Sequence, residues 1–368
     1  MDSSTSLPTL VAWLAFALAF VFGAAAQRCN FCTMGAITDI VNFGEWRRMR
    51  MWLLAIAVAI LGANALWASG QADLSKSLYV SPNLIWLSHL FGGFLFGFGM
   101  TLASGCGSRT LIRLGAGNLK SLVVVVFLAL AAYMTLRGAL ALLRVNAFDA
   151  VKWNMGMAQD LPTLIGAAGA GPLARWVVPL AVGVALLVFI FKDAEFRATR
   201  EYVIGGLIIG AVIVGGWYVT GHIGHLAEDP KTLEEAFVAT NSNRPESFSF
   251  VAPVAYLLEL LIFWTDQSKI MTFGVAGVLG MMVGAMAMAI ATKTFRWEGF
   301  VSTEDLVNHI VGGLLMGFGG VTALGCTIGQ GLTGISTLAV GSILTFFAII
   351  GGCVVAVKYQ EWRIERMA

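Results

Sequence analysis

The chain has 368 residues, of which 58% are hydrophobic and 12% carry a charge. Soluble domains carry about 25% charged residues, so this composition excludes an ordinary soluble protein and indicates one that crosses a membrane many times. The net charge of +2, without a dense basic cluster, does not indicate nucleic-acid binding. The five cysteines are an odd number, and four of them lie in or beside apolar stretches, which argues against a disulfide framework.

Apolar stretches long enough to span the bilayer recur along the chain. They cover residues 10–26, 52–69, 84–103, 121–143, 173–191, 201–220, 271–291, 305–323 and 338–357. The first follows an acidic leader, so we interpret it as a retained helix and not as a signal peptide. Residues 27–44 and 248–264 are too short or too polar for a crossing and suit re-entrant segments, which must be buried in protein. The sequence therefore predicts an all-α polytopic membrane protein with about nine transmembrane helices plus re-entrant segments.

An internal repeat relates the two halves of the chain. A shift of 220 residues places "HLFGGFLFGFGMTLASGC" (89–106) on "HIVGGLLMGFGGVTALGC" (309–326) without a gap. Five predicted helices precede the second half, so the two repeats should have inverted topology, as in many transporters. We predict a first inverted repeat over residues 1–150, a connecting segment with one transmembrane helix over 151–200, and a second inverted repeat over 201–368.

Each copy of the repeat ends in Gly-Cys followed by short polar residues. Glycine permits turns that other residues resist, and a helix that starts after a break points its positive end at the break. We interpret the two breaks as an anion site with a thiol at its centre, although a buried thiol can also serve only as a small packing group, as we expect for Cys353. The candidate residues are Gly105, Cys106 and Ser108 in the first copy, and Gly325, Cys326, Thr327 and Gln330 in the second.

Other residues that could carry chemistry give weaker signals. Cys29 and Cys32 form a Cys-x-x-Cys motif, which suits a redox pair or half of a zinc site, but no second pair follows to complete four zinc ligands. His89 and His309 could relay protons, yet each precedes a glycine-rich helix, where a structural role is the better interpretation. We predict no cofactor.

The segments "RCNFCTMGAI", "GFGMTLASGCGSRTLIRLGAGNLKSL" and "GFGGVTALGCTIGQGLTGISTLAVGS" resemble the signatures of the YeeE/YedE sulfur-transport family, whose characterised members take up thiosulfate. The resemblance covers nearly the whole chain. It implies a bacterial inner-membrane protein of two inverted halves, hourglass-shaped, with three cysteines along the conduction path and a small cytoplasmic sulfurtransferase as partner. On this sequence the three are Cys32, Cys106 and Cys326, with Cys29 left open as an alternative to Cys32.

The predicted function is uptake of thiosulfate into the bacterial cytoplasm, without enzyme activity. Placing the N-terminus outside and the C-terminus inside puts about twice as many lysines and arginines on the inner side as on the outer side. Neutral thiols are weak donors, so they could pass a dianion along without trapping it. Three alternatives remain open: transport of another sulfur or selenium species, a membrane thiol oxidoreductase, and a soft-metal transporter with cysteine and methionine ligands.

Overall fold

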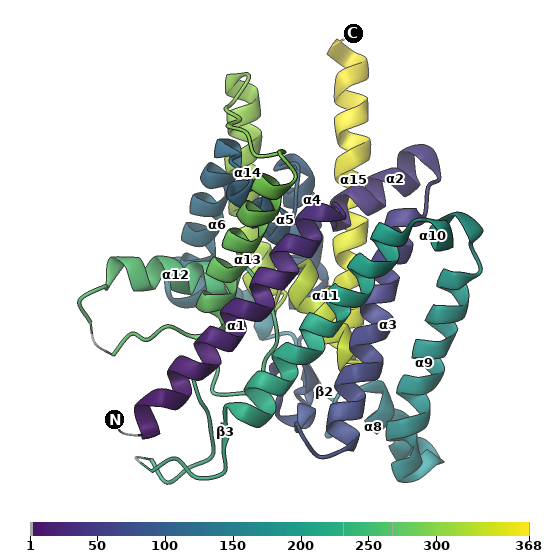
Figure 1. Cartoon of the computed structure of the whole chain (residues 1–368), viewed down its shortest axis with the longest axis vertical. Coiled ribbons are helices and arrows are strands. Elements are labelled where there is room, and N and C mark those ends of the chain that lie inside the picture. The colour runs from purple at the N-terminus through teal and green to yellow at the C-terminus, as the bar shows by residue number, and fades with distance from the viewer. Residues whose placement is uncertain (1–2, 231, 267, 368) are drawn as a thin grey trace.

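The computed structural model describes residues 3–230, 232–266 and 268–367, and these residues are mostly helical (Figure 1). The long helices are α1 (Ser3–Arg28), α3 (Arg47–Ala68), α4 (Trp86–Leu102), α6 (Leu119–Arg137), α9 (Ala174–Phe191), α11 (Arg200–Tyr218), α13 (Phe273–Ala291), α14 (Thr303–Thr322) and α15 (Val340–Met367). The short α-helices are α2 (Thr33–Phe43), α5 (Gly107–Gly115), α7 (Ala139–Leu143), α8 (Leu161–Ile165), α10 (Ala194–Ala198) and α12 (Ala252–Ile262).

The described chain also contains 3-10 turns, π-helical turns and two short pairs of strands. The 3-10 turns are η1 (Leu74–Lys76), η2 (Leu78–Val80) and η5 (Gly171–Leu173), and the π-helical turns are η3 (Arg144–Asp149), η4 (Gly166–Ala170), η6 (Val219–Ile223) and η7 (Gly329–Gly334). The strand pairs are antiparallel: β1 (Asn83–Leu84) with β2 (Trp153–Asn154), and β3 (His225–Leu226) with β4 (Ala236–Phe237).

The prediction of an all-α polytopic membrane fold is confirmed. Within the described residues, eight helical segments are long and apolar enough to cross a membrane. The sequence predicted about nine, and the difference is α14, which has 20 residues but carries Glu304 and Asp305 in its first turn. Large apolar side chains such as Val188 on α9 and Phe347 on α15 are exposed. Such side chains favour contact with lipid over contact with water.

The two copies of the repeat pack against each other through α4 and α14. Gly92 contacts Gly319, whereas Gly99 contacts Gly312. Residue numbers thus rise along one helix as they fall along the other, so α4 and α14 are antiparallel. The flanking helices follow the same symmetry, because α4 also packs on α15 and α14 also packs on α6. This is the opposite orientation that the repeat predicts, and it places both Gly-Cys breaks in the interior.

The turn at each break differs from the sequence prediction in one detail. The left-handed residues are Ser104 (φ 56°) and Leu324 (φ 60°), each one position before the glycine of Gly-Cys. Close packing explains why glycine occupies the next position, Gly105 or Gly325. A Cβ on Gly105 would lie 3.3 Å from Cγ of Arg109, and one on Gly325 would lie 3.1 Å from Cγ of Gln330. The helix after each break therefore folds back closely over a residue without a side chain.

Three buried hydrogen bonds hold the helix after the second break, which covers residues 327–336 and includes η7. Asn64 Nδ2 donates to the Ser336 carbonyl oxygen at 2.8 Å, and Trp217 Nε1 donates to Ser336 Oγ at 2.9 Å. Thr333 Oγ1 donates to the Phe248 carbonyl oxygen at 2.7 Å. Helices α3 and α11 and the segment before α12 therefore fix the position of this helix relative to the rest of the interior.

Candidate functional site

Three buried cysteines occupy the same structural position, directly before the first turn of a short helix. Cys32 precedes α2, Cys106 precedes α5, and Cys326 precedes the helix that contains η7. Cys32 Sγ accepts a hydrogen bond from the Gly35 amide and Cys326 Sγ accepts one from the Gly329 amide, each at 3.4 Å. These sulfur atoms satisfy amides that the start of a helix leaves without an intrahelical partner.

A thiol at the start of a helix offers an anion two favourable interactions. The first turn carries the partial positive charge of the helix dipole, which favours a nearby negative charge. A thiol whose sulfur accepts a bond from the helix amide still has its S–H as a weak donor. The cysteine positions therefore combine weak hydrogen-bond donors with a positive electrostatic potential, and this combination suits a small anion.

The fold brings these thiols together from distant parts of the sequence. Cys32 and Cys106 lie within hydrogen-bonding distance of each other. Cys106 Sγ is also 3.3 Å from Ser108 Oγ, and the Thr327 hydroxyl lies beside it. Cys326 is close enough to Cys106 for the two groups to interact electrostatically. The thiols of both repeats thus form one cluster.

Buried polar groups without partners surround this cluster. In the described part of the chain, Thr33 Oγ1, Thr327 Oγ1, Gln330 Oε1 and Arg109 Nη1 are buried and make no hydrogen bond. Each belongs to a residue within four positions of one of the three cysteines. Buried polar groups are normally paired, and leaving one unpaired costs about 1–3 kcal/mol. The cluster therefore holds donors and acceptors that a polar ligand could satisfy.

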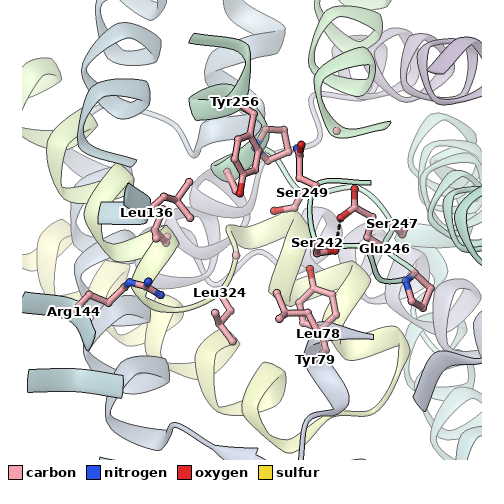
Figure 2. A pocket seen from close by; sticks show the side chains of 18 residues that line it. Leu78, Tyr79, Leu136, Arg144, Ser242, Glu246, Ser247, Ser249, Tyr256 and Leu324 are labelled. Atoms are coloured by element: carbon pink, nitrogen blue, oxygen red, sulfur yellow. Dashed lines mark hydrogen bonds between the residues drawn. The ribbon is translucent and has the colours of Figure 1, made fainter. Parts of the chain in front are cut away.

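A cavity of about 160 Å³ adjoins the cluster (Figure 2). Most of its surface is apolar, and we call it the polar cavity after the serine, glutamate and arginine side chains in its lining. Its lining includes Leu78, Tyr79, Leu136, Arg144, Asn241, Ser242, Pro245, Glu246, Ser247, Ser249, Ala252, Pro253, Tyr256, Gly274, Gly320, Val321, Leu324 and Gly325. Gly325 directly precedes Cys326, and Tyr79 interacts electrostatically with Cys326. The polar cavity thus ends beside the residue that precedes the thiol of the second repeat.

Glu246 gives the polar cavity a titratable carboxyl group. The side chain is half-buried, and Ser242 Oγ donates a hydrogen bond to its Oε2 atom at 3.2 Å. Burial raises the pKa of Glu246 from its ordinary value to about 7. Arg144 also lines the cavity, but it forms an ion pair with Asp149 at 3.2 Å. Glu246 therefore changes its charge near neutral pH.

A second cavity, of about 640 Å³, lies at the C-terminal ends of α1, α5 and α13, and we call it the basic cavity. Its lining comprises Gln27, Arg28, Asn30, Arg109, Arg113, Ala116, Asn118, Thr292, Lys293, Thr294, Phe295, Arg296 and Glu298. Arg109 connects the cavity to the thiols, because its guanidinium also interacts electrostatically with Cys32 and Cys106. The end of α1 lies on the side toward which α15 runs, opposite the N-terminus (Figure 1).

The other cysteines lie in different surroundings. Cys29, at the end of α1, faces α11: a Cβ on Gly205 would lie 2.7 Å from Cys29 Sγ. Cys353 accepts a hydrogen bond from Thr101 Oγ1 at 3.3 Å. Among the described residues neither thiol forms a hydrogen bond with Cys32, Cys106 or Cys326, although Cys353 is close enough to Cys106 for the two groups to interact electrostatically. Cys29 therefore makes different contacts from its Cys-x-x-Cys neighbour Cys32.

The remaining candidates lie at the breaks, and the histidines lie in helices. Gln330 Nε2 donates to the Ala323 carbonyl oxygen at 2.6 Å and so spans the second break. His89 Nδ1 is 2.7 Å from Thr345 Oγ1, and His309 Nδ1 is 2.7 Å from the Asp305 carbonyl oxygen. Both histidines therefore contribute packing and hydrogen bonds within the helical core.

Some residues at the site are absent from the sequence prediction. Tyr79 comes from η2, and Glu246 and Ser249 come from the segment before α12, so their role depends on folding against the second break. One sequence signal could have found Ser249: "SFSFVAP" is the second-half counterpart of "NFC". A Cβ on Gly329 would lie 2.5 Å from Ser249 Oγ, so this segment runs directly along the helix that follows Cys326.

Antiparallel repeats whose helices break around a shared polar centre define a class of membrane transporters, in which the broken helices surround the substrate. The fold and the site place this protein in that class. The chain belongs to the sulphur transport family, whose sequence model matches residues 28–355.

Two curated relatives are similar over most of their length. One, from Spirochaeta thermophila, is 26% identical over 357 residues, which is 94% of this chain and 98% of the relative. The other, from Escherichia coli, is 26% identical over 334 residues, which is 85% of this chain and 84% of the relative. Both carry the name thiosulfate transporter TsuA.

Proposed function

We propose that this protein takes up thiosulfate across the inner (plasma) membrane of a bacterial cell. The observation that carries the proposal is the cluster of three thiols, each at the start of a helix, in a chain of the sulphur transport family. The names of the two relatives support thiosulfate as the substrate. Thiosulfate is a small dianion with a soft terminal sulfur, and it suits weak S–H donors under the positive ends of helix dipoles.

The path for the anion runs between the two cavities. From the polar cavity it passes Tyr79 and Cys326, then Cys106 and Cys32, and leaves through the basic cavity past Arg109. Helix dipoles offset part of the cost of removing a dianion from water. Neutral thiols bind the anion weakly, so that it can leave each position again. A thiolate would repel the anion, so transport requires protonated cysteines.

The N-terminus lies outside the cell and the C-terminus lies in the cytoplasm in this proposal. The distribution of lysine and arginine favours that orientation. The polar cavity is then the outer mouth of the path and the basic cavity is its cytoplasmic mouth. A small cytoplasmic sulfurtransferase, the partner that the family resemblance implies, would receive the anion at the basic cavity.

The test is uptake of radiolabelled thiosulfate by cells that lack their own importers of sulfur anions. Cys32→Ser, Cys106→Ser and Cys326→Ser should each lower uptake at least about tenfold, because each removes one of the weak donors and changes the balance of binding along the path. Cys353→Ser is the matched control and should keep wild-type uptake. Equal uptake by all four variants, at equal membrane abundance, would rule out a thiol-lined path.

The alternative is a membrane thiol oxidoreductase, in which Cys29 and Cys32 exchange a disulfide. The contacts favour transport, since Cys29 faces Gly205 whereas Cys32 lies beside Cys106. Competition distinguishes a different cargo: excess unlabelled thiosulfate should suppress labelled uptake more strongly than sulfite or selenite does. A stronger effect of selenite would make a selenium species the substrate.

A further inference from the structure

The basic cavity holds more positive charge than its neighbours neutralise. Its lining has five cationic side chains and one carboxylate. Arg28 is paired with Glu201, and Arg296 is paired with Glu298. The other three cations, Arg109, Arg113 and Lys293, form no ion pair in the described part of the chain.

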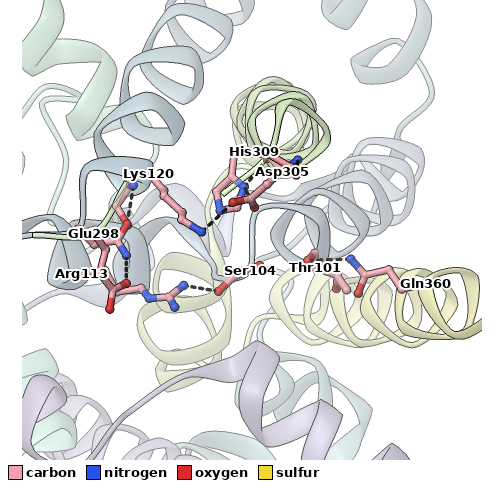
Figure 3. Close-up of polar contacts among 11 residues, drawn as sticks. Thr101, Ser104, Arg113, Lys120, Glu298, Asp305, His309 and Gln360 are labelled. Atoms are coloured by element: carbon pink, nitrogen blue, oxygen red, sulfur yellow. Dashed lines mark hydrogen bonds and ion pairs between the residues drawn. The ribbon is translucent and has the colours of Figure 1, made fainter. Parts of the chain in front are cut away.

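Two of these three cations are held in place by neutral groups. Arg113 Nη1 donates to the Ser104 carbonyl oxygen at 2.8 Å, and Arg109 Nη2 donates to Asn30 Oδ1 at 3.0 Å (Figure 3 shows the Arg113 bond). These bonds orient the guanidinium groups without cancelling their charge. Guanidinium groups present several N–H donors in a fixed planar arrangement that matches oxyanions. The two guanidinium groups are therefore oriented and still carry a charge that an anion could neutralise.

Lys293 is placed at the cavity by the left-handed turn that ends α13. It follows the last residues of α13 with φ 56°, in the left-handed region that favours glycine. A residue with a side chain costs roughly 1 kcal/mol there compared with glycine. The left-handed turn ends α13, because the Lys293 amide donates to the Ile290 carbonyl oxygen at 3.1 Å and the Thr294 amide donates to the Ala289 carbonyl oxygen at 2.8 Å. Lys293 is exposed at the edge of the cavity, where its ammonium group can reach an anion held by the two arginines.

We propose that the basic cavity is a binding site for a tetrahedral oxyanion group with two or more negative charges or a single phosphodiester charge, bound by Arg113 and Lys293 and attracted by Arg109. Inorganic sulfate and the phosphate of a lipid headgroup share this chemistry. Arg109 lines the cavity and also interacts with Cys32 and Cys106, so the cavity lies near these thiols. An anion bound in the cavity therefore repels the next dianion that arrives at Cys32 and Cys106.

This repulsion gives the site a regulatory effect. Sulfate on the cytoplasmic side should slow uptake by occupying the exit, and release of thiosulfate should depend on the same cations. The regulatory effect rests on the proposed function, whereas anion binding in the basic cavity does not.

Binding is tested with purified full-length protein in discs of neutral lipid, titrated with sodium sulfate at constant ionic strength against sodium chloride. Sulfate should raise the melting temperature of the wild type, because a ligand that binds the folded state stabilises it. Arg113→Gln with Lys293→Gln should weaken the apparent affinity at least about tenfold. The matched control Arg244→Gln removes one exposed charge from the loop before the polar cavity and should leave sulfate binding unchanged.

Three further results decide the proposal. Lys293→Arg should retain sulfate binding, which shows that the loss in the glutamine variant comes from charge and not from misfolding. Equal stabilisation of the wild type and the double glutamine variant by sulfate would overturn the proposal. Stabilisation by discs containing phosphatidylglycerol, without stabilisation by sulfate, would assign the site to a lipid phosphate and overturn the regulatory effect.

The regulatory effect is tested in vesicles loaded with sulfate or with chloride. Internal sulfate should slow thiosulfate uptake by the wild type, and the double glutamine variant should lose this inhibition. Cys106→Ser separates the two proposals, since it should abolish uptake and still bind sulfate. If Cys106→Ser transports normally, the thiol path is wrong, while the sulfate titration still decides the basic cavity.

Discussion

Gly92 of α4 packs directly against Gly319 of α14. A Cβ on Gly92 would lie 2.7 Å from the Gly319 carbonyl oxygen, and a Cβ on Gly319 would lie 2.6 Å from the Gly92 carbonyl oxygen. The 220-residue shift turns this pair into Gly312 and Gly99, whose corresponding distances are 2.6 Å and 2.8 Å. The crossing of the two repeats is therefore a two-fold symmetric contact of backbone on backbone, and small residues permit such an approach.

Gly92→Ala should destabilise the protein by about 1–3 kcal/mol, because its Cβ would meet backbone atoms that cannot move aside. The measurement is the melting temperature in detergent, followed by size-exclusion chromatography. Gly351→Ala in α15 is the control, since no atom beyond its chain neighbours and the backbone of its own helix lies within 4 Å of the added Cβ. The alanine there should be neutral or slightly stabilising. Equal melting temperatures for the two variants would contradict the close crossing.

Uptake should fall as the external pH rises through 7. Below that pH Glu246 is mostly neutral, and above it the carboxylate faces an incoming dianion in the polar cavity, where Tyr79, Tyr256 and the Asp149-paired Arg144 are the other titratable lining groups. Glu246→Gln should therefore remove most of the decline between about pH 6 and pH 8 and raise uptake at the alkaline end.

Glu235→Gln is the control for this pH profile. Lys76 and His225 hold the pKa of Glu235 below its ordinary value, so this carboxyl stays ionised throughout the range. Its replacement should leave the slope of uptake against pH unchanged. A pH profile of Glu246→Gln that matches the wild type would show that Glu246 does not face the anion.

Ser336→Ala should lower the stability of the protein, because it removes a hydrogen bond that holds the helix after the second break. The change leaves the buried Trp217 Nε1 without its acceptor, which costs about 1–3 kcal/mol. Ser342→Ala is the matched control, because the buried Ser342 Oγ has no hydrogen-bond partner in the described structure. The melting temperature should fall for Ser336→Ala only. A similar fall for both variants would indicate a packing effect instead of the lost hydrogen bond.

Cys29→Ser should keep thiosulfate uptake, whereas Cys32→Ser should lose it. The reason is contact: Cys29 Sγ packs against Gly205 of α11, and Cys32 lies beside Cys106. The measurement is radiolabelled uptake normalised to the amount of protein in the membrane. Loss of uptake in Cys29→Ser at normal abundance would place Cys29 on the path and restore the redox-pair alternative.

The sequence alone predicted the features that depend on local pattern. Apolar runs of transmembrane length indicated the helices, and the matched glycines of residues 89–106 and 309–326 indicated the repeat and its breaks. These signals are strong because hydrocarbon demands long apolar helices and because close helix crossings demand small residues. The turn itself was placed one residue late, since Ser104 and Leu324 adopt the left-handed conformation.

Only the tertiary structure decided which side chains share a site. Cys32 and Cys106 are 74 positions apart, and Tyr79, Glu246 and Arg109 acquire their roles from cavities built by several helices. No local periodicity records such proximity, because it follows from how the two repeats cross and from where the intervening loops return. The sequence by itself therefore determined a membrane fold of paired, broken helices with thiols at the breaks. Tertiary packing brought Cys32 to Cys106 and placed Cys326 of the second repeat near them, and it placed Glu246 in one adjoining cavity and five cationic side chains around the other.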